Sequence, residues 1–164
     1  MAELFTWELL IKLIAVTIAS VTFAMLLRIN RRHLVFAGIG AAMTYLLYAT
    51  FTALIGSLFV AAFISTLCTA LYAEILARVR RAPTIIFSLT GVIPTVPGGD
   101  LYHAMRHLIT GNVNEALTHL VITVEIGLGI AGGIVTMSIL FGILTDAFRA
   151  ARRMREQKKS GCNK

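Results

Sequence analysis

Long apolar runs separated by short basic turns dominate the pattern of the chain. The first run covers residues 9–27 and ends at the basic turn 28–33. The next forty residues carry no formal charge. As one helix they would be about 60 Å long, roughly twice the hydrocarbon thickness of a bilayer. We therefore expect two antiparallel helices, over residues 34–54 and 57–77, with the break at Gly56-Ser57.

The segment after the second basic turn, 78–83, has an irregular pattern. Residues 84–93 are apolar, but as a helix they would be only about 15 Å long. The stretch Pro94–Asp100 cannot continue a regular helix, because Pro97 lacks an amide hydrogen and would clash with the preceding turn. A helical pattern then resumes over residues 101–110. The pattern predicts a fourth span made of two half-helices that meet at this Pro-x-x-Pro-Gly-Gly segment.

The last apolar run covers about residues 117–148, and Gly129-x-x-x-Gly133 within it offers a close-packing face for another helix. Composition supports the membrane interpretation: 57% of residues are hydrophobic and 14% are charged, against roughly 45–50% and 25% in soluble domains. We expect an all-α integral membrane protein with about five transmembrane helices. Residues 1–148 would form the membrane domain, and residues 149–164 a basic cytoplasmic tail that ends disordered.

The net charge of +7 follows the turns and the tail. If the N-terminus is outside and the C-terminus cytoplasmic, thirteen of the 15 Lys and Arg residues lie on the cytoplasmic side, as the positive-inside rule requires. The basic clusters carry no interleaved aromatic residues for base stacking, so a nucleic-acid partner is not expected. The N-terminus lacks the features of a cleaved signal, and the first run is expected to remain as a span of a bacterial-type cytoplasmic membrane.

The interrupted segment is the main candidate site. Unpaired backbone groups at membrane depth cost several kcal/mol each unless protein or water meets them. In transporters such breaks lie near the midplane and direct the N-terminus of a half-helix at an anionic substrate. Gly98 and Gly99 would let a carboxylate approach the backbone closely. A proline kink or an ordinary loop is the alternative. Asp100 is either the N-cap of the second half-helix or a functional carboxylate.

Two further titratable groups share a face with Asp100. His103 and His107 follow it at helical spacing, which suits a proton relay or two interfacial histidines facing water. A metal site would need further ligands that no other cluster supplies, so neither a metal nor another cofactor is expected.

Glu125 is a carboxylate inside the last apolar run. Such groups usually face the bundle interior and mark a proton or ion path. The alternative is a position near the outer interface, paired with Arg106 or His119. The chain shows no sequence motif of a known enzyme class, so we expect a non-enzyme.

The segment Val92–Met105, with its Ile-Pro-x-x-Pro-Gly motif, resembles the threonine/serine exporter family. Ala82-Pro83 before it and Phe23-Ala24-Met25 also resemble that family, and the likeness is to its smaller, C-terminal-type integral membrane unit. The resemblance implies a secondary exporter of small polar metabolites, which are threonine and serine in some members and dicarboxylates such as succinate in others. It also implies a larger membrane subunit of the same family, or a homo-oligomer, as partner.

These arguments give a set of candidate residues. The expected proton-coupling residues are Glu125 and His103. The expected substrate-binding residues form one continuous segment with a following tyrosine, and the resemblance implies Pro94, Pro97, Gly98 and Tyr102 as its signature. The full set is Pro94, Thr95, Pro97, Gly98, Gly99, Asp100 and Tyr102.

Two other functions stay open at this point. The chain could be a structural or regulatory membrane subunit that docks on a larger transporter through the face of Gly129 and Gly133 without touching substrate. It could also be an intramembrane enzyme whose residues converge from different helices.

Overall fold

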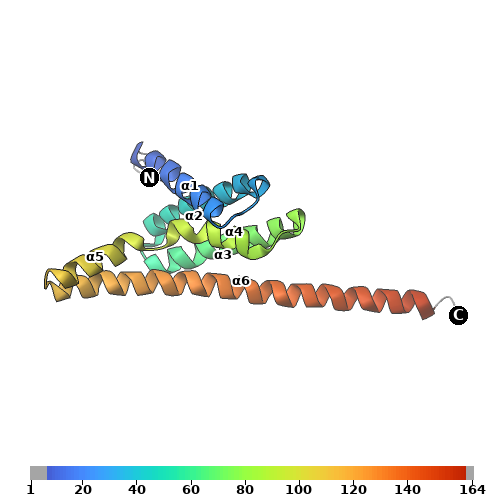
Figure 1. The fold of residues 1–164 in the computed structure, drawn as a ribbon. Helices are drawn as coiled ribbons and strands as arrows, with labels where there is room; N and C mark the ends of the chain where they lie inside the picture. Colours follow the sequence, from blue (N-terminus) through green and yellow to red (C-terminus); the bar gives the residue numbers. More distant parts are fainter. Residues whose placement is uncertain (1–6, 162–164) are drawn as a thin grey trace.

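The computed structural model describes residues 7–161, with side-chain positions for Trp7 and residues 9–145. Within this range the chain consists of helices and short turns, with no strand. The expected all-α fold is confirmed. The four long helices are α1 (Trp7–Leu26), α2 (Arg31–Ile55), α3 (Leu58–Arg80) and α6 (Val113–Gly161), and α6 runs along the whole length of the molecule (Figure 1).

The four long helices are also apolar enough to cross a membrane, over residues 9–26, 31–55, 58–80 and 113–145. The predicted break of the long uncharged run is confirmed. Gly56 adopts the left-handed conformation that ends α2, and the Ser57 side chain caps the start of α3 by accepting from the Val60 amide.

The expected fourth span is divided into three pieces. These are α4 (Thr84–Val92), the 3-10 turn η2 (Ile93–Thr95) and α5 (Gly98–Ile109). The twelve apolar residues of α4 and η2 are too few to cross a bilayer alone. α4 packs on α2 and α3, whereas α5 packs on α6. In Figure 1, α4 and α5 follow one another toward the corner where α6 begins. The five-span count stays a prediction.

Small and hydroxyl-bearing residues form much of the core. The Thr44 and Thr69 hydroxyls lie 2.5 Å apart, and each also lies within hydrogen-bond distance of a carbonyl of its own helix, so their two protons serve two of these three contacts at a time. Gly91 of α4 packs against Thr69, where a Cβ atom would lie 2.6 Å from the Thr69 methyl group. Close approach of helices and internally paired hydroxyls are typical of bundles in lipid, where no water is present to satisfy polar groups.

The basic segments gather at one end of the bundle. Residues of both basic turns line one cavity, with Arg28, Asn30 and His33 from the first turn and Arg81 and Pro83 from the second. The Arg78 guanidinium donates to the Thr145 hydroxyl of α6 over 2.7 Å and lies 4.0 Å from Glu74, the partner expected from the i+4 spacing. The turn between α2 and α3 and the α5–α6 corner lie at the opposite end (Figure 1). This arrangement fits the one-sided distribution of Lys and Arg.

The tail that was expected to end disordered is helical as far as Gly161, because α6 continues through residues 149–161. Its 49 residues correspond to a rod about 74 Å long, far more than a bilayer requires. The added part is rich in Ala, Arg, Lys, Glu and Gln, which all favour helix. Residues 162–164 lie outside the described range.

Candidate functional site

The Pro-x-x-Pro-Gly-Gly segment breaks the helix at two residues, Val96 and Pro97, between η2 and α5. Val96 is extended, and Pro97 forms a tight turn in which the Gly98 amide donates to the Val96 carbonyl over 2.8 Å. The Leu101 amide donates to the Pro97 carbonyl over 3.1 Å. The amides of Gly99 and Asp100 have no acceptor among the described residues. Two free donors therefore mark the N-terminus of α5.

The surroundings of these amides are open within this chain. Gly98 and Gly99 are exposed, and a Cβ atom built on either would meet nothing within 4 Å. A ligand or a partner could therefore reach the backbone without displacing any part of this chain.

Asp100 is not the N-cap that sequence suggested as one of its roles. Pro97 occupies the N-cap position without a capping side chain, and Asp100 is the third residue of α5. Its Oδ1 atom lies 3.0 Å from Nδ1 of His119 on α6. About a third of the Asp100 side chain and a quarter of the His119 side chain are exposed.

Two further histidines lie beside this pair. The ring of His103 stacks on His119 with 5.4 Å between centroids, and the ring of His107 stacks on it with 5.8 Å. The Nδ1 atom of His107 is buried and has no described partner. We name Asp100, His103, His107 and His119 the Asp–His cluster. In the described part of the chain no group of three ligands is arranged to hold a metal ion.

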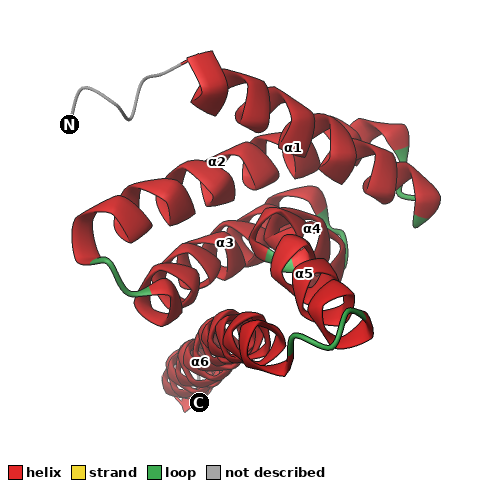
Figure 2. Cartoon of the chain, turned by 90° about the vertical axis from the view of Figure 1, so that its left-hand side faces the viewer, coloured by secondary structure: helices red, strands yellow, loops and turns green. Residues whose placement is uncertain are grey.

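Sequence reasoning named His119 only as a possible partner of Glu125. The feature that would have indicated the contact of His119 with Asp100 is the tight turn between α5 and α6. Gly111, in the left-handed conformation, ends α5 and lets α6 return antiparallel beside it. The polar face of α5 must then meet the first turns of α6, where His119 lies. Figure 2 views this corner end-on and shows α5 next to α6, apart from α1 and α2.

Glu125 does not pair with Arg106 or His119. Its Oε1 atom accepts from the Phe59 amide over 3.2 Å and so caps the first turn of α3. The contact gives Glu125 a structural role at the end of the bundle where α3 begins.

These contacts give the position of the helix break along the bundle. His119 precedes Glu125 by six residues, about 9 Å along α6. Because Asp100 contacts His119 and Glu125 contacts the start of α3, α5 begins near that end of the bundle, not halfway along α3. Along the long helices, this position differs from the midway position that transporter breaks led us to expect.

The remaining predicted substrate-binding residues are not brought together. Thr95 is buried, and its hydroxyl donates to the Val92 carbonyl over 2.8 Å. Pro94 is half-buried within η2. Tyr102 is 65% exposed and lies on the side of α5 away from Asp100. Gly98, Gly99 and Asp100 are thus the part of the set that shares one accessible place.

The predicted close-packing face on α6 is used inside the chain. A Cβ atom on Gly129 would lie 2.7 Å from the Phe59 carbonyl oxygen, and one on Gly133 would lie 2.9 Å from that of Phe63. Both glycines therefore face α3. They are therefore not free to contact a partner. The alternative of a structural subunit that docks on a larger transporter through Gly129 and Gly133 loses its docking face.

Four long apolar helices that leave most of their large apolar side chains exposed define a multi-pass membrane protein. Residues 12–140, well over half of the chain, match the family described as Threonine/Serine exporter, ThrE. The chain belongs to the threonine/serine exporter family. Membership supports export of threonine- and serine-type solutes, and it places the chain among transporters rather than enzymes. No curated protein and no solved structure matches the chain.

Proposed function

We propose that the chain is a subunit of a secondary transporter that exports carboxylate-bearing metabolites, either threonine and serine or a dicarboxylate such as succinate. The observation that carries the proposal is the start of α5, where the free amides of Gly99 and Asp100 lie beside the Asp–His cluster. Family membership supports a small polar cargo of the threonine and serine type.

The substrate carboxylate would accept from the amides of Gly99 and Asp100. The helix dipole favours negative charge at this place, and the missing side chains at Gly98 and Gly99 allow close approach. The ammonium group of threonine or serine would bind the Asp100 carboxylate. For a dicarboxylate, the second carboxylate would instead accept from a ring N–H group of a histidine in the cluster.

Proton coupling is assigned to His103 and Glu125. His103 stacks on His119, which contacts Asp100, so a proton taken up by the cluster changes the charge that the substrate meets. Protonation of Glu125 would weaken its bond to the Phe59 amide, because a neutral carboxyl is a poorer acceptor than a carboxylate. Proton binding would then loosen the first turn of α3, at the end of the bundle where α5 begins.

A second membrane subunit would complete the site. Gly98 and Gly99 are open in this chain, and Leu101, Tyr102 and Met105 of α5 present apolar surface on the side away from α6. A larger membrane subunit of the same family, or a second copy of this chain, would cover that surface. The N-terminus would be outside and the basic end cytoplasmic, with five crossings of the cytoplasmic membrane.

The test is export from vesicles that carry the chain with and without a larger family subunit. Labelled threonine, serine and succinate are loaded in turn, with and without a proton gradient. We expect gradient-driven export of at least one solute when both subunits are present. If vesicles with both subunits release the solutes no faster than protein-free vesicles, the proposal is contradicted. A chemically altered product would indicate an enzyme.

A further inference from the structure

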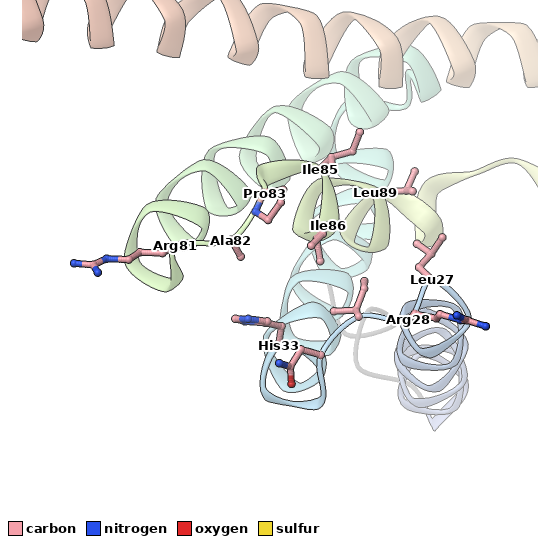
Figure 3. Close-up of a pocket in the computed structure, with 11 residues that line it drawn as sticks. Leu27, Arg28, His33, Arg81, Ala82, Pro83, Ile85, Ile86 and Leu89 are labelled. Atoms are coloured by element: carbon pink, nitrogen blue, oxygen red, sulfur yellow. The ribbon is translucent and has the colours of Figure 1, made fainter.

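A second site lies at the opposite end of the bundle from the Asp–His cluster. A cavity of about 540 Å³ opens between the α1–α2 turn and the α3–α4 turn. Its walls are mostly apolar, with Leu27 from the first turn and Ile86 and Leu89 from α4. Figure 3 shows Arg28 and Arg81 at opposite edges of the cavity, with their guanidinium groups directed outward. We propose that this interfacial cavity binds an anionic phospholipid of the surrounding bilayer.

The backbone at both arginines supports a functional role. Arg28 and Arg81, with φ of 55° and 52°, are the two non-glycine residues in the left-handed region between residues 7 and 161. Each follows the end of a long helix, and in each case the next amide, of Ile29 or Ala82, donates back to the helix over 3.1 Å. Glycine is the usual residue at this position, because a Cβ atom is unfavourable there. An arginine at both places indicates that the side chain is needed.

The two guanidinium groups are also unpaired. Neighbouring basic residues are engaged: Arg78 contacts Glu74 and Thr145, and Arg80 lies 4.2 Å from the centre of the Phe36 ring. Arg28 and Arg81 have no hydrogen bond or ion pair with any side chain that the structure describes. They are therefore available to bind an anion.

The apolar walls distinguish a lipid from a small polar solute. Ile85 is 70% exposed, Leu89 47% and Leu27 43%, and all three line the cavity. A free phosphate or a small metabolite would leave these side chains uncovered, whereas an acyl chain would cover them. Basic pockets between helices at the membrane boundary are the sites at which phosphate headgroups bind.

The experiment titrates the full-length chain in detergent micelles with dioleoylphosphatidylglycerol or dioleoylphosphatidylcholine and counts bound lipid by native mass spectrometry. We expect the anionic lipid to bind more tightly. The variant Arg28→Gly/Arg81→Gly should bind it about thirtyfold more weakly, since each arginine near an anionic headgroup contributes several-fold in affinity. Glycine suits the left-handed backbone, so this variant should unfold at the same temperature as the wild type or higher without lipid.

The matched control is Arg31→Gln/Arg32→Gln, which removes the same charge from residues that do not line the cavity. It should keep nearly full affinity. Equal binding of the two lipids would overturn the proposal, as would equal loss in the control. Displacement of the lipid by inorganic phosphate would show a free-phosphate site and would also overturn it.

Discussion

Two pairs of glycines in this molecule have opposite surroundings. Gly129 and Gly133 face α3 so closely that a Cβ atom on either would lie within 3 Å of a backbone carbonyl oxygen. Gly98 and Gly99 begin α5 in open space, and neither has a positive φ. The fold of the chain requires the first pair and does not require the second.

The difference separates packing from recognition. Glycine costs a helix about 0.5–1 kcal/mol relative to alanine, and at Gly129 and Gly133 this cost is offset by the close contact of α6 with α3. No contact within the described residues offsets it at Gly98 and Gly99. We infer that a ligand or a partner approaching the α5 backbone is the reason for glycine there.

The largest expected effect is on the α3–α6 contact. Gly129→Ala with Gly133→Ala should lower the free energy of unfolding by about 3 kcal/mol, because backbone atoms cannot move aside. Reversible unfolding in mixed micelles measures this. Gly142→Ala is the control, since nothing lies within 4 Å of a Cβ there. Equal stability of the double variant and the control would remove the packing role.

A smaller loss is expected where α4 meets α3. Gly91→Ala should cost about 1.5 kcal/mol, because the added methyl group meets the Thr69 side chain, which can shift more easily than backbone. The Thr44–Thr69 hydrogen bond would be strained by that shift. The same unfolding measurement checks this prediction, and a loss as large as that of the Gly129/Gly133 double variant would contradict the distinction.

Two substitutions of Glu125 separate its role as the cap of α3 from its proposed role in proton coupling. Glu125→Ala should cost about 1 kcal/mol, because the Phe59 amide loses its acceptor, whereas Glu125→Gln keeps an acceptor and should cost less. If Glu125 also carries the proton, Glu125→Gln should flatten the pH dependence of export. A wild-type pH profile in that variant would leave only the structural role.

The smallest effect on stability is expected at the Asp–His cluster. The Asp100–His119 pair is partly exposed, so Asp100→Asn should cost less than about 1 kcal/mol. Its effect on transport should depend on the solute. Export of threonine should fall, because the ammonium loses its partner, while export of a dicarboxylate should persist. Equal loss for both solutes would argue against ammonium binding at Asp100.

Local sequence signals predicted the parts of this fold that depend on neighbouring residues. Gly56-Ser57 ends one helix and caps the next, and the prolines break the fourth segment, because turn and cap chemistry act within a few residues. The close-packing face at Gly129 and Gly133 was also predicted, although hydropathy could not say that its partner is α3 of the same chain.

The contacts that sequence did not predict join distant residues. The pairing of Asp100 with His119, and of Glu125 with the Phe59 amide, depends on the register in which α6 returns along α5 and α3. The helical periodicity of a sequence determines which residues share one face of a helix, but it does not determine which face of the neighbouring helix they contact. Thr95 and Tyr102 lie apart from Asp100 for a local reason: Thr95 is buried before the break, and Tyr102 follows Asp100 by two residues and so lies on the other side of α5.

The most direct test of the account is export by Gly98→Val, with Gly142→Val as control, in vesicles that contain the larger subunit. Both positions are open in this chain, so both variants should insert and unfold like the wild type. We predict that Gly98→Val abolishes export, because the added side chain blocks the amides of Gly99 and Asp100, and that Gly142→Val exports normally. Wild-type export by Gly98→Val would contradict the claim that the start of α5 holds the substrate.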